Sequence, residues 1–428
     1  MKKTLLFLTI LTGMGLNAQN HPAKANESKE IHIVMGNAAD STKVYDAFVE
    51  NAPKRFNIPG APRFAIVGKD EKFYFGIGGL AKATVSFDFP NPINSGQYFT
   101  TANIPMHGAP GNGGLFQINA QQSSLFFNFV AFPGSKNRLG AYINFDLCGN
   151  NYTPFLQYAY LTWRDFIVGY NTTLFLDGAA SAPTIDKEGP NATTYAINPL
   201  VDYAHKFKNG ITLAVGAEIG PESFTTTSKT ASVNQRIPDI PAYIQYNFKG
   251  NPNSYVRFSA ILRNMQYRDD VKDKNGNVTG WGIKASGILP ASNKFIAYFQ
   301  MGYGKGITSY FEDMAGLGLD LTPDPSVSGK LEAVKAWGGY IGLQYNFSKK
   351  CYSSVTYSQT RNYANGYSDG STPWDSQYKY GQYLAANVFY NITSQLTWGA
   401  EWDWGRRVDM NGLSRHDNRL QTMLQFTF

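Results

Sequence analysis

From Phe73 onward the chain alternates between apolar and polar residues with a period of two. Between Phe73 and Asp88 one parity carries Phe, Ile, Ala and Val, whereas the other carries Tyr, Gly, Lys, Thr and Asp. This period is typical of a strand with two different faces. The segment spans about 16 residues, far more than the usual strand of about five or six, so it is long enough to cross a membrane at a tilt.

The same alternation returns along the rest of the chain, and charged residues repeatedly occupy the face that a soluble fold would bury. An unpaired charge in an apolar core is very costly, so this pattern indicates a hydrated interior. An even number of strands is what a single-chain bacterial barrel requires. We predict sixteen strands, close to 72–89, 115–132, 138–147, 153–163, 166–175, 196–207, 211–220, 239–248, 254–267, 279–289, 294–305, 335–347, 351–363, 382–392, 395–406 and 418–428.

The predicted connections fall into two alternating classes. Short turns such as 133–137 and 208–210 alternate with longer loops such as 90–114 and 306–334, and the brief connection 148–152 is the exception. Membrane barrels have short periplasmic turns on one rim and long extracellular loops on the other. The sequence therefore predicts an all-β, transmembrane antiparallel β-barrel of about 16 strands with both chain ends on the periplasmic side.

The N-terminal residues have the features of a secretory signal peptide. Met1-Lys2-Lys3 precedes a short apolar run and a small-residue exit that ends at Ala18. That run is too short for a membrane helix, and polar residues interrupt every later apolar stretch before about 18 residues. We therefore expect a signal peptide over 1–19, a periplasmic N-terminal segment with little fixed structure and one short helix over 20–71, and the barrel over 72–428. Export by a signal peptide places this barrel in the bacterial outer membrane.

The last strand alternates to the final residue and ends in an aromatic side chain. Phe426 and Phe428 stand at the end of the segment that begins at Arg419. A terminal aromatic residue behind alternating apolar positions resembles the signal that the outer-membrane barrel insertion machinery reads. We interpret Phe428 and Phe426 as an assembly signal.

Composition restricts the function further. The chain holds 42 Gly and 15% aromatic residues, yet its mean hydropathy is −0.30, which suits a wall that is apolar on one side only. The net charge of +7 is spread without a basic run, so nucleic acid is not an expected partner. Cys148 and Cys351 are too few for a disulfide framework and fall at opposite ends of the predicted barrel, so we expect them to be unpaired.

Charged residues on the polar parity are candidates for a selective constriction. Rows of cations and carboxylates can set the field across a pore, and the alternative is that these charges are paired wall residues or rim residues that keep the lumen wet. Arg257 and Arg263 are the strongest candidates because both lie on the polar parity of one strand. The predicted pore-lining set is Arg257, Arg263, Lys82, Lys284, Arg138, Glu218, Asp88 and Asp146, and Arg407, Arg419, Glu401 and Asp403 share the parity.

Signals for catalysis are weak. The histidines show no pair at metal-ligand spacing, and the glycines of 76–79 precede no helix, so they form no phosphate cradle. A barrel protease or phospholipase remains an alternative because His107 and His416 fall in predicted loops near Ser414 and Asp417. We expect a protein that is not an enzyme and that needs neither cofactor nor metal.

Short motifs follow one another in a consistent order between residue 58 and about residue 305. They are Ile58-Pro59-Gly60, Gln122-Ser123, Gln157-Tyr158-Ala159-Tyr160, Val168-Gly169-Tyr170, Leu176-Asp177, Gly189-Pro190, Asn198-Pro199, 214–219, Ile237-Pro238-Asp239 and 260–263. In these motifs the chain resembles the DcaP-like family of trimeric porins. The resemblance implies a sixteen-stranded trimeric barrel that passes small, often anionic, organic solutes. This chain departs from the family where Ser124 or Leu125 and Asp202 replace expected wall arginines, and where the N-terminal segment lacks the apolar heptads of a coiled coil.

Two functions from different classes fit these observations. The first is an outer-membrane porin that gives passive diffusion of small polar solutes, anions among them, through a water-filled lumen. The second is an outer-membrane binding or adhesion protein whose long extracellular loops contact partners while the barrel stays closed. The expected partners of the first are small polar solutes, outer-membrane lipid, the barrel insertion machinery and, from the family resemblance, two further copies of the chain. Conductance in a planar bilayer distinguishes the two.

Overall fold

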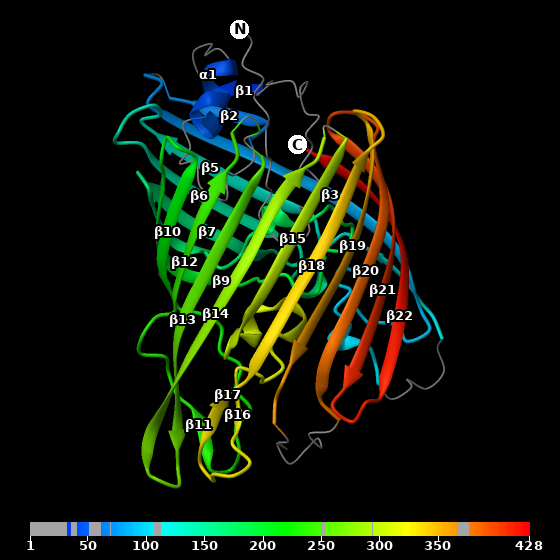
Figure 1. Ribbon diagram of the computed structural model, residues 1–428. Helices are drawn as coiled ribbons and strands as arrows, with labels where there is room; N and C mark the ends of the chain where they lie inside the picture. The colour runs from blue at the N-terminus through cyan, green and yellow to red at the C-terminus, as the bar shows by residue number, and fades with distance from the viewer. Residues whose placement is uncertain are drawn as a thin grey trace.

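Sixteen long antiparallel strands form one closed barrel (Figure 1). The computed structural model describes residues 32–35, 41–50, 61–68, 70–106, 113–249, 251, 253–292, 294–365 and 376–428. β22 closes the barrel against β3, from the pair Asn418 and Phe89 to the pair Thr427 and Leu80. The strands of the wall are β3 (Phe73–Phe89), β5 (Ser124–Ala131), β6 (Leu139–Asp146), β7 (Phe155–Trp163), β8 (Phe166–Thr172), β9 (Ile197–Lys206), β10 (Ile211–Glu218), β12 (Ile240–Asn247), β13 (Tyr255–Asp269), β14 (Lys274–Pro290), β15 (Phe295–Lys305), β18 (Lys335–Asn346), β19 (Cys351–Asn362), β20 (Tyr378–Asn391), β21 (Leu396–Asp409) and β22 (Ser414–Thr427).

The predicted fold class and strand number are confirmed, with one strand divided. The segment predicted as a single strand over 115–132 consists of β4 (Leu115–Asn119) and β5, and both pair with β3. Three strands begin four or more residues before their predicted starts, namely β14 at Lys274, β20 at Tyr378 and β22 at Ser414. The sheet therefore continues past the alternating segments into polar residues that hydrophobicity alone assigns to loops.

Glycines in β3 lie where the inner wall is crowded. A Cβ on Gly78 would stand 2.4 Å from the ring of Phe126, and one on Gly76 would stand 2.3 Å from Pro62. Both distances are shorter than any van der Waals contact. Glycine at these positions therefore lets Phe126 and Pro62 pack directly against the backbone of β3. These glycines lie within a strand and precede no helix, as the sequence indicated.

The segment before the barrel has more structure than the sequence suggested. β1 (His32–Met35) pairs in parallel with β2 (Phe64–Val67), and β2 pairs antiparallel with β3. The predicted short helix is present as α1 (Ser41–Tyr45) and η2 (Asp46–Glu50). Phe48 is buried and packs edge-on against the Tyr74 ring at 6.1 Å, in a cluster that also contains Val130 of β5. The segment thus packs onto the inner wall at the barrel end where the C-terminus lies (Figure 1). The signal peptide predicted over 1–19 lies outside the described residues.

The long connections at the opposite end carry short elements of their own. Cys148 follows β6 at this end, whereas Cys351 begins β19 at the other, and both are free thiols. The connections contain η3 (Thr101–Asn103), η4 (Asn150–Tyr152), η5 (Gly178–Ala180), β11 (Thr230–Ser232), η6 (Thr308–Tyr310), η7 (Glu312–Met314), β16 (Leu321–Pro323) and β17 (Leu331–Ala333).

Candidate functional site

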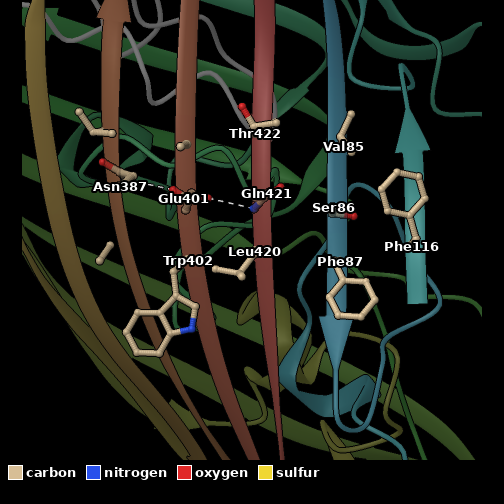
Figure 2. A pocket seen from close by; sticks show the side chains of 13 residues that line it. Val85, Ser86, Phe87, Phe116, Asn387, Glu401, Trp402, Leu420, Gln421 and Thr422 are labelled. Carbon is tan, nitrogen blue, oxygen red and sulfur yellow. Dashed lines mark hydrogen bonds between the residues drawn. The ribbon is translucent and has the colours of Figure 1, made fainter. Parts of the chain in front are cut away.

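The wall separates an apolar outer face from a polar inner face. In Figure 2 the side chains of Phe87, Phe116, Trp402 and Leu420 stand on one face of the sheet around a shallow apolar depression, whereas Glu401 lies on the opposite face of β21. Glu401 accepts hydrogen bonds there from Asn387 Nδ2 at 2.8 Å and Gln421 Nε2 at 3.0 Å. The outer face suits lipid, and the inner face carries hydrogen-bonding side chains between clusters of buried aromatic and aliphatic ones.

The loop between β8 and β9 folds inside the barrel. Every residue from 171 to 194 except Gly178 is buried. The inner wall holds the main chain of this loop on several sides. Asn387 Nδ2 donates to the Pro183 carbonyl at 2.7 Å, Glu401 accepts from the Ile185 N–H at 2.8 Å, and Gln300 Nε2 donates to the Ala192 carbonyl at 2.7 Å. The loop therefore runs across the lumen as a fixed constriction.

Two other long connections join this loop inside the lumen. The Tyr195 N–H donates to the Tyr310 carbonyl at 2.7 Å, so the connection 306–334 pairs with it directly. Asp313 fastens all three connections together because it accepts from Thr101 Oγ1 at 2.7 Å, from the Ala102 N–H at 2.9 Å and from Asn191 Nδ2 at 3.4 Å. The extracellular loops that narrow the lumen thus form one hydrogen-bonded unit.

Arg257 and Arg263 point into the barrel, and both guanidinium groups are fully enclosed. Arg257 Nη1 lies 3.3 Å from Asp177 Oδ1, and its Cζ lies 4.3 Å from the centre of the Tyr243 ring. Arg263 is bound by two carboxylates, with 2.8 Å between its Nε and Asp239 Oδ2 and 3.1 Å between its Nη1 and Asp320 Oδ2.

The two predicted lysines bind neutral oxygens. Lys82 Nζ donates to the Ile185 carbonyl at 3.0 Å and to the side chain of Gln122. Lys284 Nζ donates to Thr194 Oγ1 at 2.7 Å and to the Phe175 carbonyl. Both side chains therefore reach from the wall to the main chain or side chains of the inward loop.

The predicted carboxylates also face the lumen and are bound there. Asp88 pairs with Arg419 across the closing seam at 2.7 Å, and Asp146 pairs with Lys187 of the inward loop at 2.7 Å. Glu218 accepts from Thr173 Oγ1 at 2.8 Å and from the Tyr310 hydroxyl at 2.7 Å. Arg138 lies apart from this group, half-buried in the short turn before β6 at the periplasmic end.

Sequence reasoning missed the charged residues of the inward loop. Asp186 accepts from the Phe99 N–H at 3.0 Å, and Lys187 and Glu188 follow it, yet the whole stretch was predicted only as an extracellular loop. Burial raises the pKa of the Asp186 carboxyl to about 6 and raises the pKa of Glu188 well above its ordinary value. The available signal was the pair of motifs Leu176-Asp177 and Gly189-Pro190, which bracket these residues.

The described residues give catalysis no clear centre. They contain no group of three or more His, Cys, Asp and Glu side chains that fits a metal ion. Within those same ranges no helix has the length and hydropathy to cross a membrane. His416 and Ser414 both lie in β22, and His107 lies outside the described part of the chain.

A closed sixteen-stranded barrel with a polar lumen and an inward loop defines the class of outer-membrane channels. Comparison with solved structures agrees. The DcaP outer membrane channel of Acinetobacter baumannii superposes with a TM-score of 0.71 at 19% identity, over 85% of this chain and 99% of that one. OmpT of Vibrio cholerae in its trimer form gives 0.53 at 11% identity, over 83% of this chain and 100% of that one. An anion-selective porin from Comamonas acidovorans gives 0.52 at 8% identity, over 83% of this chain and 100% of that one.

The family model of the porin subfamily matches residues 125–424. The chain therefore belongs to this porin subfamily, and it is a passive-diffusion porin of the bacterial outer membrane. No curated protein matches the sequence. The resemblance to DcaP-like porins that the short motifs suggested is confirmed by the family match and by the fold.

Proposed function

We propose that small polar solutes diffuse through the lumen along the surface between the inner wall and the inward loop 173–196. The observation that carries this proposal is the division of the wall, with large apolar residues exposed outside and most of the charged and amide side chains enclosed inside. A barrel that served only as an anchor would not need so polar an interior, because an apolar packed core would stabilise it better.

Reconstitution in a planar bilayer tests the proposal. Stepwise conductance in potassium chloride supports a diffusion channel. An insulating barrel would refute it and would favour the alternative, a binding or adhesion protein that uses the extracellular loops. We also infer that the chain has no enzymatic activity, in keeping with its channel fold, and ester and peptide hydrolysis assays on the purified barrel check this.

We infer that Arg257 and Arg263 act on permeation by holding the constriction in place. Arg257 binds Asp177 of the inward loop, and Arg263 binds Asp320 of the connection 306–334. Their charges are thereby balanced locally, so solutes meet Arg257 as part of a neutral pair and Arg263 beside two carboxylates. We assign the other predicted wall charges, except Arg138, to the same lumenal surface.

We infer further that three copies of the chain assemble. The supporting observations are the resemblance to trimeric porins and the similarity to OmpT, which is described in a trimer form. Chemical cross-linking of the protein in outer-membrane vesicles, followed by electrophoresis without heating, checks the number of copies. If the protein migrates with the mass of one barrel both with and without the cross-linker, the trimer assignment is wrong.

A further inference from the structure

Six carboxylates meet where the inward loops touch the wall. Four consecutive residues of the connection 90–114 bind three of them. The Phe99 N–H donates to Asp186 at 3.0 Å, the Thr100 hydroxyl donates to Glu188, and the Thr101 hydroxyl and the Ala102 N–H donate to Asp313 at 2.7 and 2.9 Å. The six residues, called the acidic constriction below, are Asp186, Glu188, Glu312, Asp313, Glu401 and Asp403.

The wall brings the last two carboxylates against the same loop. Glu401 accepts from the Asp186 N–H at 2.7 Å. The Tyr383 hydroxyl lies 3.3 Å from Asp186 Oδ2 and 3.2 Å from Asp403 Oδ1, so it joins the loop to β21. Glu312 precedes Asp313 in η7, and its N–H donates to the Thr193 carbonyl at 3.0 Å.

The acidic constriction contains more carboxylates than there are cations close to it. None of its six carboxylates forms an ion pair with a lysine or arginine of the described chain, and the hydrogen bonds that they accept come from N–H, hydroxyl and amide groups. Neighbouring cations are bound elsewhere, since Lys187 lies 2.7 Å from Asp146 and Arg419 lies 2.7 Å from Asp88. The ammonium of Lys82 reaches the Ile185 carbonyl beside the cluster, which leaves an excess of carboxylates.

Two of the carboxylates keep an oxygen without a hydrogen-bond donor. Glu188 is only 7% exposed, and its Oε1 has no partner among the described residues. Glu312 Oε2 has none there either. A buried carboxylate oxygen normally accepts a hydrogen bond, so each of these atoms is an acceptor that no group of the described chain uses.

We propose that the acidic constriction makes this porin prefer cations, above all organic ammonium and guanidinium solutes, over anions, and that Glu188 and Glu312 determine this preference. The inference rests on the proposed diffusion function and names the charge of the solute. It is opposite to the passage of anionic solutes that the resemblance to DcaP-like porins implied. The arginines lie in the lumen, but Asp177, Asp239 and Asp320 balance them.

The zero-current potential in a potassium chloride gradient at low salt tests the proposal. Burial and the neighbouring carboxylates raise the pKa of Glu188 and of Glu312 well above the ordinary value, so both groups ionise more fully as the pH rises. We therefore expect the wild-type channel to be cation-selective, more strongly at alkaline than at neutral pH, and the double variant Glu188→Gln/Glu312→Gln to lose roughly fivefold of its cation-to-anion permeability ratio at alkaline pH. That factor corresponds to about 1 kcal/mol, the attraction of two unit charges at about 4 Å in bulk water. The matched control Glu332→Gln removes a carboxylate of β17, beyond the acidic constriction, and should leave the ratio unchanged.

The outcomes separate this inference from the function on which it rests. An insulating protein overturns both. A conducting channel that is anion-selective, or whose selectivity the double variant does not change, overturns the cation preference alone. If the double variant fails to form a heat-modifiable barrel, liposome swelling with the wild-type protein decides instead. Faster entry of a small diamine than of a dicarboxylate of equal size supports the proposal, and the reverse order refutes it.

Discussion

The ion pair that crosses the closing seam gives the sharpest test of how the lumen is stabilised. Arg419 of β22 lies directly opposite Asp88 of β3. Its Nε and Nη2 each lie 2.7 Å from one oxygen of the carboxylate, and both side chains are fully enclosed. Replacement of Arg419 by Met removes one partner and leaves a buried carboxylate uncompensated. We expect the free energy of unfolding to fall by about 3–5 kcal/mol, the usual cost of breaking a buried pair.

The double variant Asp88→Leu/Arg419→Met shows how much of the loss in Arg419→Met comes from the carboxylate that is left buried without a partner. Because desolvation of two charges offsets most of their attraction, apolar partners of similar volume are often tolerated. We therefore expect the double variant to regain most of the stability that Arg419→Met loses. Urea unfolding in lipid vesicles, followed by tryptophan fluorescence and by the gel shift of the unheated barrel, measures each variant. If Arg419→Met alone lowered the free energy of unfolding by less than about 1 kcal/mol, the pair would behave like an ion pair screened by water, and its enclosure would not contribute to stability.

Three further changes have defined outcomes. Replacing Arg257 and Arg263 together by Ala should move the zero-current potential toward cation selectivity, because three aspartates lose their positive partners. The shift should be larger at low salt than at high salt, because screening is weaker there. An unchanged potential at low salt would show that the two arginines do not influence ion selectivity. Deleting Phe428 should reduce assembled barrel in the outer membrane far more than it reduces stability in vitro, as quantified by membrane fractionation, and normal levels would argue against an assembly signal. Gly169→Val should lower the temperature to which the barrel must be heated before it unfolds, as measured by its gel mobility. This glycine has φ +141°, and a Cβ would stand 2.4 Å from the Ala159 carbonyl. Gly113→Ala serves as the control, because a Cβ at that position meets nothing within 4 Å.

The wall was predictable because each strand repeats one physical requirement, lipid outside and water inside. That requirement fixes the parity of residues such as Phe87 and Asp88, so alternation alone gave the strand number and the facing of the predicted charges. Boundaries were less predictable. β22 begins at Ser414 because its hydrogen bonds continue into polar residues, where hydrophobicity carries no signal.

The interior of the lumen was not predictable in the same way. Asp186 and Asp313 are 127 residues apart in the chain, and both bind within the segment 99–102 only because two long loops turn inward. Loop composition gives no period from which such a fold could be inferred. For the same reason the partners of Arg263 were hidden, since Asp320 comes from a connection that the sequence predicted only as extracellular.

The placement of β2 has a consequence for how the barrel closes. β22 ends with Phe428 bonded in both directions to Gly79 of β3, and Arg63, next to β2, donates to Ile77 on the same edge. A slip of β22 by two residues toward the periplasm would keep every side chain on its proper face, so facing alone cannot prevent it. With β2 in place that slip would drive the chain end into an occupied edge. The segment ahead of the barrel thus acts as a mechanical stop that admits one alignment of the last strand.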